Sequence, residues 1–244
     1  MIPAMSTPLP VGKLPADLLQ QLLQRAPQSD ERVLLGPQFG VDCAVLDMGE
    51  RLLVLKSDPI TFATADIGRY LVQVNSNDIA TMGATPRWLL VTALLPENQT
   101  SPELVLAISE QLYAACVELG ISVVGGHTEI THGLERPILA GTLIGEVARE
   151  KLVTPQGMQP GDHILLTKGV PIEGTALLAT EFPERLGNIL SPEELATAQN
   201  YLVSPGITVL REAQIATAAG RVTAMHDPTE GCLLYTSPSP RDHL

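Results

Sequence analysis

The sequence predicts an α+β fold, in which a mixed or antiparallel sheet is covered by helices on one face. Between residues 33 and 153, strand patterns occur in pairs near both ends, with two helical patterns and a further strand between them. Paired strands of this kind suit antiparallel pairing, and the helices would pack on one side of the sheet. The opposite face then needs a cover, so we expect a second copy of the chain or a second domain to bury it.

Each element is predicted from hydrophobic spacing and from capping residues. The clearest is a helix that begins after Ser101, an N-cap residue followed by Pro102, and ends before Gly120. Asp58 and Pro59 are expected to end a hairpin. His127, Thr128 and Glu129 fall in a polar loop between the last two strands. The predicted elements are a helix over 15–25, a hairpin of strands 43–47 and 51–56, a helix over 67–82, a buried strand over 88–95, a helix over 102–119, and strands over 121–124 and 138–147.

A second unit is expected to begin near residues 154–161, where prolines and glycines cluster. It opens with a strand pattern over 163–167 and a helical stretch around 173–180. A loop rich in proline and glutamate follows, and then a helix over 208–219 that ends at Gly220.

Composition restricts the function. The 244 residues are 45% hydrophobic and 17% charged, and the net charge of −12 repels nucleic acid and anionic membranes. No apolar run reaches the length of a membrane span and no signal pattern precedes the chain, so we expect a cytoplasmic protein. The three cysteines, Cys43, Cys116 and Cys232, form neither a disulfide framework nor a metal pair. A polyanionic ligand would need a local device such as a metal ion.

Acidic and amide side chains are the candidates for chemistry, because the chain has neither a P-loop nor a dinucleotide-binding glycine motif. Asp42 follows Gly40, Asp58 follows a strand, and Asn75 and Asp78 are three residues apart on one helix. Glu129 follows Gly125 and Gly126. Oxygen ligands of this kind suit Mg²⁺.

Each of these residues also has a structural explanation. Asp42 and Asp58 could be turn formers. Asn75 and Asp78 could bond to the local backbone. His127 is more simply a hydrogen-bonding group than a metal ligand, since no second His or Cys stands at ligand spacing.

Taken together, the motifs resemble the aminoimidazole ribonucleotide synthetase (PurM-like) superfamily. The most specific run is residues 75–86, Asn-x-x-Asp-Ile-Ala-x-Met-Gly-Ala-x-Pro. Further matching runs are residues 40–46, 57–59, 125–129, 160–168 and 226–231, so the resemblance covers residues 33–231. Within the superfamily, residues 58–62 and 225–229 are most similar to the hydrogenase maturation factor HypE and its relatives.

This resemblance implies an ATP-dependent enzyme that forms a homodimer through its first domain and works with hydrogenase maturation partners. Asp42, Asp58 and Asp78 would hold Mg²⁺ on the ATP phosphates, and Asp227 would approach the same metals from the second domain. Asn75, Asp78, Gly125, Gly126, Thr128 and Glu129 would bind the nucleotide. No catalytic residue is assigned. The predicted segments are a helical extension (1–32), an ATP-binding, dimerising domain (33–153), a partial C-terminal domain (154–231) and a non-native tail (232–244).

In HypE-like enzymes, ATP drives the dehydration of a carbamoyl or thiocarboxamide group to the cyanide of a hydrogenase. The alternatives are an enzyme of the thiamine monophosphate kinase or aminoimidazole ribonucleotide synthetase type, and a non-catalytic nucleotide-binding maturation partner.

The sequence departs from the family pattern in three places. His127 stands where the family often has a carboxylate, residues 232–244 replace a glycine-rich helix start, and no Pro-Arg-Ile-Cys ending is present. We therefore expect a C-terminally shortened chain with exposed apolar faces on its second half, which either expresses poorly or hydrolyses no ATP.

Overall fold

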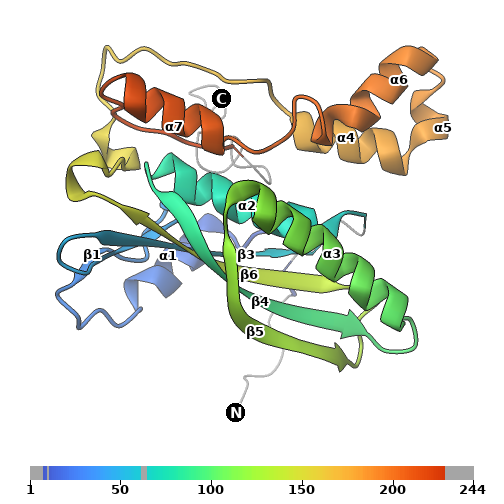
Figure 1. The fold of residues 1–244 in the computed structure, drawn as a ribbon, viewed down its shortest axis with the longest axis horizontal. Helices are drawn as coiled ribbons and strands as arrows, with labels where there is room; N and C mark the ends of the chain where they lie inside the picture. The colour runs from blue at the N-terminus through green and yellow to red at the C-terminus, as the bar shows by residue number, and fades with distance from the viewer. Residues whose placement is uncertain (1–7, 10, 62–64, 229–244) are drawn as a thin grey trace.

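The computed structural model describes residues 8–9, 11–61 and 65–228 (Figure 1). The three single-turn 3₁₀ helices lie at Arg149–Lys151, Pro155–Gly157 and Asn200–Leu202. The remaining elements are α1 (Ala16–Gln24), β1 (Val33–Leu35), β2 (Ala44–Asp47), β3 (Leu52–Ile60), α2 (Ile67–Thr81), β4 (Thr85–Pro96), α3 (Pro102–Leu119), β5 (Ser122–Thr131), β6 (Ile138–Val147), α4 (Ile172–Glu181), α5 (Pro183–Leu186), α6 (Pro192–Gln199) and α7 (Leu210–Ala219).

One six-stranded sheet, in the order β1-β2-β3-β6-β4-β5, forms the first part of the chain. It confirms the mixed α+β fold. The expectation of antiparallel pairs at both ends is wrong for β5, which pairs in parallel with β4. The reason is the intervening helix α3. It carries the chain from the end of β4 back to the edge of the sheet where β4 begins, so β5 runs in the same direction as β4. The last strand, β6, then lies between β3 and β4 and is antiparallel to both.

The predicted hairpin is confirmed as β2 and β3, but Asp58 and Pro59 do not end it. The strand β3 continues to Ile60 and pairs with β6 along its whole length. β2 pairs only with Leu52–Leu55, so beyond that point one side of β3 pairs with no described segment. A proline is tolerated at such an edge because no ladder hydrogen bond is demanded of it there. As a result, Asp58 is held in a strand.

The predicted polar loop at residues 127–129 is also wrong, because these residues lie within β5. β4 is twelve residues long and pairs with β5 from Trp88 as far as Pro96. This long partner provides hydrogen bonds for the whole run of ten residues, including the two glycines. The register shifts once, between Leu89 and Leu90, where the partner strand carries one extra residue.

α2 and α3 cover one face of the sheet, as expected (Figure 1). The caps of α3 are those predicted: the Ser101 hydroxyl accepts a hydrogen bond from the Leu104 backbone N–H, and Gly120 ends the helix with φ 68°. α2 lies between the sheet, α3 and α7, so it is buried on nearly every side. Its polar residues are therefore buried together with its apolar ones.

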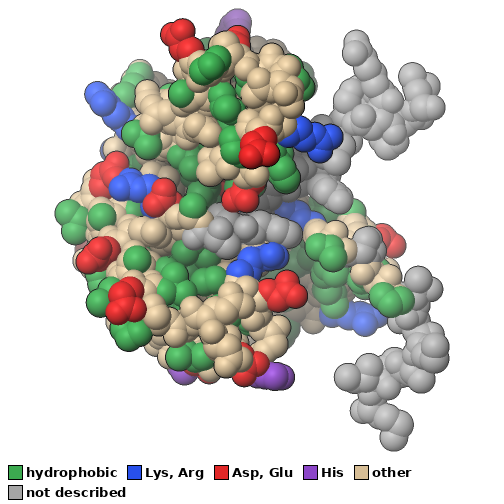
Figure 2. Space-filling model, turned by 90° about the vertical axis from the view of Figure 1, so that its right-hand side faces the viewer, with side chains coloured by type: hydrophobic (Ala, Val, Ile, Leu, Met, Phe, Trp, Pro, Cys, Tyr) green, Lys and Arg blue, Asp and Glu red, His purple; other side chains and the backbone are tan. Residues whose placement is uncertain are grey.

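The second part of the chain contains a small helical group, α4 to α6, and the helix α7 above α2 (Figure 1). The helices predicted around 173–180 and 208–219 are confirmed as α4 and α7. The loop predicted between them contains α5 and α6. Apolar side chains lie on the surfaces of this group and of α3 (Figure 2).

The strand predicted over residues 163–167 is absent from the described structure. Ile164, Leu165 and Leu166 are 92%, 88% and 70% exposed. A strand needs a partner for its backbone groups, and no described segment pairs with this run. The expected open apolar face is therefore present here. The residues of the predicted tail lie outside the described part of the chain.

Candidate active site

The side-chain ammonium of Lys56 lies among three of the four carboxylates predicted to bind metal. Its Nζ atom is 3.1 Å from Asp58 Oδ2, 3.1 Å from Asp78 Oδ2 and 3.6 Å from Asp42 Oδ1. The Lys56 and Asp78 side chains are only 8% and 6% exposed, whereas Asp42 is 50% exposed. The cluster is thus closed on the protein side and open to solvent at Asp42.

The fold explains why these residues meet. Alternation along β3 places Lys56 and Asp58 on the same face as the buried residues Leu52 and Val54, which is the face beneath α2. Asp78 lies on α2 directly over this part of the sheet. Asp42 is in the loop that leads into β2, the neighbour of β3.

Asp227 is the fourth carboxylate of the cluster, and it comes from the chain beyond α7. It is 7% exposed, and its Oδ2 atom has no hydrogen-bond partner among the described residues. It lies close enough to Asp42, Lys56 and Asp78 for their charges to act on it. A buried carboxylate oxygen without a partner costs free energy, and a bound cation would offset that cost.

Proton affinities in the cluster reflect an excess of negative charge. Burial raises the pKa of Asp78, and the nearby Asp227 carboxylate raises it further, against the opposing effect of Lys56. Burial and Asp42 likewise raise the pKa of Asp227. For Lys56, burial alone would lower the pKa, but the surrounding carboxylates outweigh burial and raise it. One ammonium therefore does not balance four carboxylates.

The cluster has the right ligand chemistry for Mg²⁺, but its geometry is that of carboxylates around an ammonium. Carboxylate oxygens are the ligands that Mg²⁺ takes in proteins, usually together with phosphate oxygens and waters. However, no group of three or more His, Cys, Asp or Glu side chains in the described residues stands ready to hold a metal ion. The ligands would have to move from Lys56 to the metal.

Asn75 holds Asp58 in place. It is fully buried; its Oδ1 accepts a hydrogen bond from the Asp58 backbone N–H at 3.0 Å, and its Nδ2 donates to the Leu71 carbonyl at 2.9 Å. These bonds tie α2 to β3 next to the acid cluster. A direct contact between Asn75 and a phosphate stays a prediction.

The run from Gly125 to Glu129 is not brought to the acid cluster within one chain. It lies on the edge strand β5, three strand spacings from β3, or about 14 Å. All five of its residues are exposed, and His127 Nε2 lies 3.1 Å from Glu129 Oε2. Gly125, Gly126, His127 and Thr128 border a cavity of about 430 Å³ between α3 and the strands β4 and β5. Their role toward a nucleotide stays a prediction.

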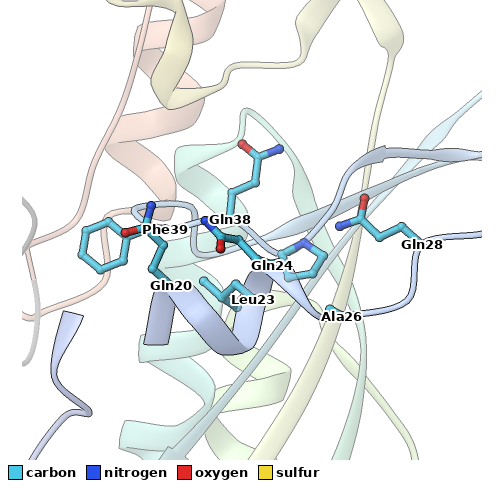
Figure 3. A pocket seen from close by; sticks show the side chains of 8 residues that line it. Gln20, Leu23, Gln24, Ala26, Gln28, Gln38 and Phe39 are labelled. Atoms are coloured by element: carbon cyan, nitrogen blue, oxygen red, sulfur yellow. The ribbon is translucent and has the colours of Figure 1, made fainter. Parts of the chain in front are cut away.

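A second hollow, of about 620 Å³, lies between α1 and the loop at residues 36–39 (Figure 3). Glutamine side chains from both segments, Gln20, Gln24, Gln28 and Gln38, line it. None of its lining residues is charged. This hollow has no group that could offset a triphosphate, so the acid cluster is the better candidate.

The part of the chain that contains strands β2 to β6 has a clear family match. Residues 40–147 match the family described as AIR synthase related protein, N-terminal domain. These residues are an AIR synthase related N-terminal domain. Asp42, Lys56, Asp58 and Asp78 all lie within this domain, and Asp227 lies outside it.

The AIR synthase related domain and the residues after it are similar to several enzymes. Carbamoyl dehydratase HypE of Cupriavidus necator is 28% identical over 228 residues, covering 88% of this chain and 62% of the relative. Selenide, water dikinase of Nitratidesulfovibrio vulgaris is 32% identical over 177 residues, which cover 68% of this chain and 47% of that relative. The solved structure of thiamine-monophosphate kinase from Stenotrophomonas maltophilia K279a has a TM-score of 0.57 at 25% identity. The match covers 83% of this chain and 63% of the kinase chain.

These comparisons confirm the predicted superfamily and its relation to HypE. The chain spans between 47% and 62% of the length of the curated relatives it matches. The relatives differ in their reactions, so the comparisons do not single out one reaction for this chain. None of the helices in the described residues combines the length and the apolarity that a membrane span requires.

Sequence reasoning missed Lys56, the central residue of the cluster. A signal was present: in the alternating strand Leu52–Ile60, Lys56 occupies an inward position, where an unpaired lysine is costly. An inward lysine two residues before Asp58 indicates a buried ion pair. The polarity of α2 around Asn75 and Asp78 was the matching signal on the helix.

Proposed function

We propose that this chain is part of an ATP-dependent enzyme that transfers a phosphoryl group to an oxygen of its substrate, with the acid cluster as its Mg²⁺ site. Asp42, Asp58, Asp78 and Asp227 would hold the metal. The observation that supports this proposal most strongly is the buried, unpartnered Oδ2 of Asp227 beside three further carboxylates and a single ammonium. When bound, Mg²⁺ neutralises charge on the phosphates and positions the γ-phosphoryl group.

The chain's own residues have three roles in this proposal. The carboxylates bind the metal, and their excess charge favours a divalent cation over a second ammonium. Asn75 positions Asp58 by fixing its backbone to α2. The exposed side of the cluster at Asp42 gives ATP access, while the buried side around Asp78 excludes water from the reacting groups.

A second copy of the chain is the proposed cover of the sheet. On the face away from α2 and α3, residues of β4 and β6 that pair with one another are partly exposed and mostly apolar, among them Trp88, Ile144 and Leu90. In the described residues no helix packs over this part of the sheet (Figure 1).

Among the reactions of this superfamily, we favour the HypE type, in which ATP drives the dehydration of a carbamoyl or thiocarboxamide group. The HypE relative matches 88% of this chain, a larger share than the selenide, water dikinase relatives, which match 66% to 82%. Other hydrogenase maturation proteins would then be the partners. Transfer of phosphate to selenide or to a phosphate ester is the alternative, and calorimetry with each candidate substrate titrated into the chain in the presence of Mg²⁺–ATP separates these reactions.

The test of the metal site is the variant Asp78→Ala. We expect it to weaken binding of Mg²⁺–ATP at least tenfold in calorimetry, which corresponds to ~1.4 kcal/mol. Asp162→Ala is the matched control, because Asp162 is an exposed aspartate that bonds to Thr223 outside the cluster. Equal affinity of the wild type and Asp78→Ala would refute the site. If the wild type bound ATP equally well without Mg²⁺, the proposed role of the metal would be refuted.

A further inference from the structure

Lys56 occupies the centre of the acid cluster in a way that the proposed function does not require. Its ammonium contacts Asp42, Asp58 and Asp78, each at 3.6 Å or less, and so takes the position in which a cation would meet the most carboxylate oxygens. An ammonium is monovalent and donates three hydrogen bonds, whereas Mg²⁺ is divalent and needs oxygen ligands at about 2.0–2.1 Å. Both cannot be held by the same carboxylate oxygens at once.

We propose that Lys56 is the resident counter-cation of the acid cluster and that a divalent cation binds there by displacing its ammonium. This inference rests on the proposed metal site. Without Lys56, four carboxylates would face one another with no positive side chain among them, and such like-charge clusters destabilise a folded chain. With Lys56 in place, the metal-free protein keeps its fold, and metal binding is weakened by the competition.

The surroundings of the cluster explain how the exchange can occur. Lys56 has a long, flexible side chain, and two of its three carboxylate partners are partly exposed, Asp58 at 26% and Asp42 at 50%. The ammonium can therefore move toward solvent on the Asp42 side while the inner carboxylates, Asp78 and Asp227, turn to the metal. On that side the ammonium would still lie close to a bound polyphosphate.

The variant Lys56→Met tests the displacement, because methionine fills a similar volume without the charge. We expect Mn²⁺, used as the probe in the absence of nucleotide, to bind this variant at least tenfold more tightly than the wild type in calorimetry. In the presence of a chelator, the unfolding midpoint of the variant should fall below that of the wild type, and Mg²⁺ should recover most of the difference. A purely structural lysine would lower the midpoint without changing Mn²⁺ affinity.

Lys168→Met is the matched control. Lys168 is also largely buried and near an acid, but its ammonium bonds to the Gly206 and Thr208 carbonyls and lies 3.6 Å from Glu212. We expect this control to lose stability that Mg²⁺ does not recover, with unchanged Mn²⁺ affinity.

The outcomes separate the two proposals. If the wild type and Lys56→Met both fail to bind Mn²⁺, the metal site itself is refuted. If both bind it with equal affinity, the metal site stands and the displacement is refuted. Should Lys56→Met not fold, Lys56→Gln gives the same comparison with one hydrogen-bond donor kept. Failure of both variants to fold, with and without Mg²⁺, would make Lys56 a structural residue and overturn the displacement.

Discussion

Asn77 on α2 and Ile207, which is 130 residues further along the chain, are joined by a hydrogen bond of 2.9 Å from the Asn77 Nδ2 atom to the Ile207 carbonyl oxygen. The Asn77 Oδ1 atom accepts a second hydrogen bond, of 2.8 Å, from the Val209 backbone N–H. Both halves of this buried amide are thus used to hold the start of α7. Asp227 follows α7, so Asn77 helps to place the second part of the chain over the acid cluster.

We expect Asn77→Ala to release α7 from α2. The change removes two hydrogen bonds and leaves the Ile207 carbonyl and the Val209 N–H without them, which costs about 1–3 kcal/mol of stability. Hydrogen exchange followed by mass spectrometry should show faster exchange over residues 207–219, with the strands β3 and β6 unchanged. Asn188→Ala is the control, since Asn188 is exposed and bonds only to the Glu184 carbonyl in its own turn. Unchanged exchange over residues 207–219 would show that apolar packing alone holds α7.

Gly126 is predicted to tolerate no side chain. Its φ of +150° is rare for other residues, and a Cβ atom there would clash with the Val91 carbonyl oxygen of β4. Gly133→Ala serves as the control: it has a φ of +78° but open space around it, so it should lose only about 1–2 kcal/mol. Gly126→Ala should lose about 1–3 kcal/mol more, because β5 must move away from β4. Thermal unfolding of both variants measures the difference, and equal losses would mean that β5 adjusts without cost.

The proposed homodimer can be followed through Trp88, the single tryptophan of the chain. Leu90→Glu places a charge next to Trp88 on the same strand, within the face that the second copy would cover. Light scattering at micromolar concentration should show a dimer for the wild type and a monomer for this variant, with Trp88 emission shifted to longer wavelength. The control variant Leu106→Glu, at an exposed position of α3, should stay dimeric. A monomeric wild type would contradict the proposed cover.

The sequence predicted the elements with strong local signals and missed those decided by distant partners. The helix from Pro102 to Leu119 was predicted to the residue because Ser101 and Gly120 cap it. The extension of β3 through Pro59, and of β5 through His127, depended on long partner strands that no local pattern reveals. For the same reason, the apolar run 163–167 was predicted as a strand although the described structure provides no partner for it.

For the acid cluster, too, the sequence predicted some of the residues and missed others. The structure places Asp42, Asp58, Asp78 and Asp227, the acids that the family motifs mark, close to one another. They did not indicate Lys56, because the motifs mark only the acids. The glycine run on β5 belongs to the same motif set but lies at the far edge of the sheet. Sequence motifs therefore do not tell which of their residues come together within one chain.

The exposed run Ile164 to Leu166 should dominate the solution behaviour of the chain. Three neighbouring apolar side chains, in a run that pairs with no other described segment, favour association with other apolar surfaces. The double variant Ile164→Lys/Leu166→Lys should therefore bind less of an apolar dye and aggregate more slowly on heating. Its unfolding free energy should stay within about 0.5 kcal/mol of the wild type, because no described contact is lost. Val11→Lys, at a side chain that is 92% exposed, is the control and should change neither property much. A clear fall in the stability of the double variant would instead mean that this run is covered in solution, as a strand paired with a partner would be.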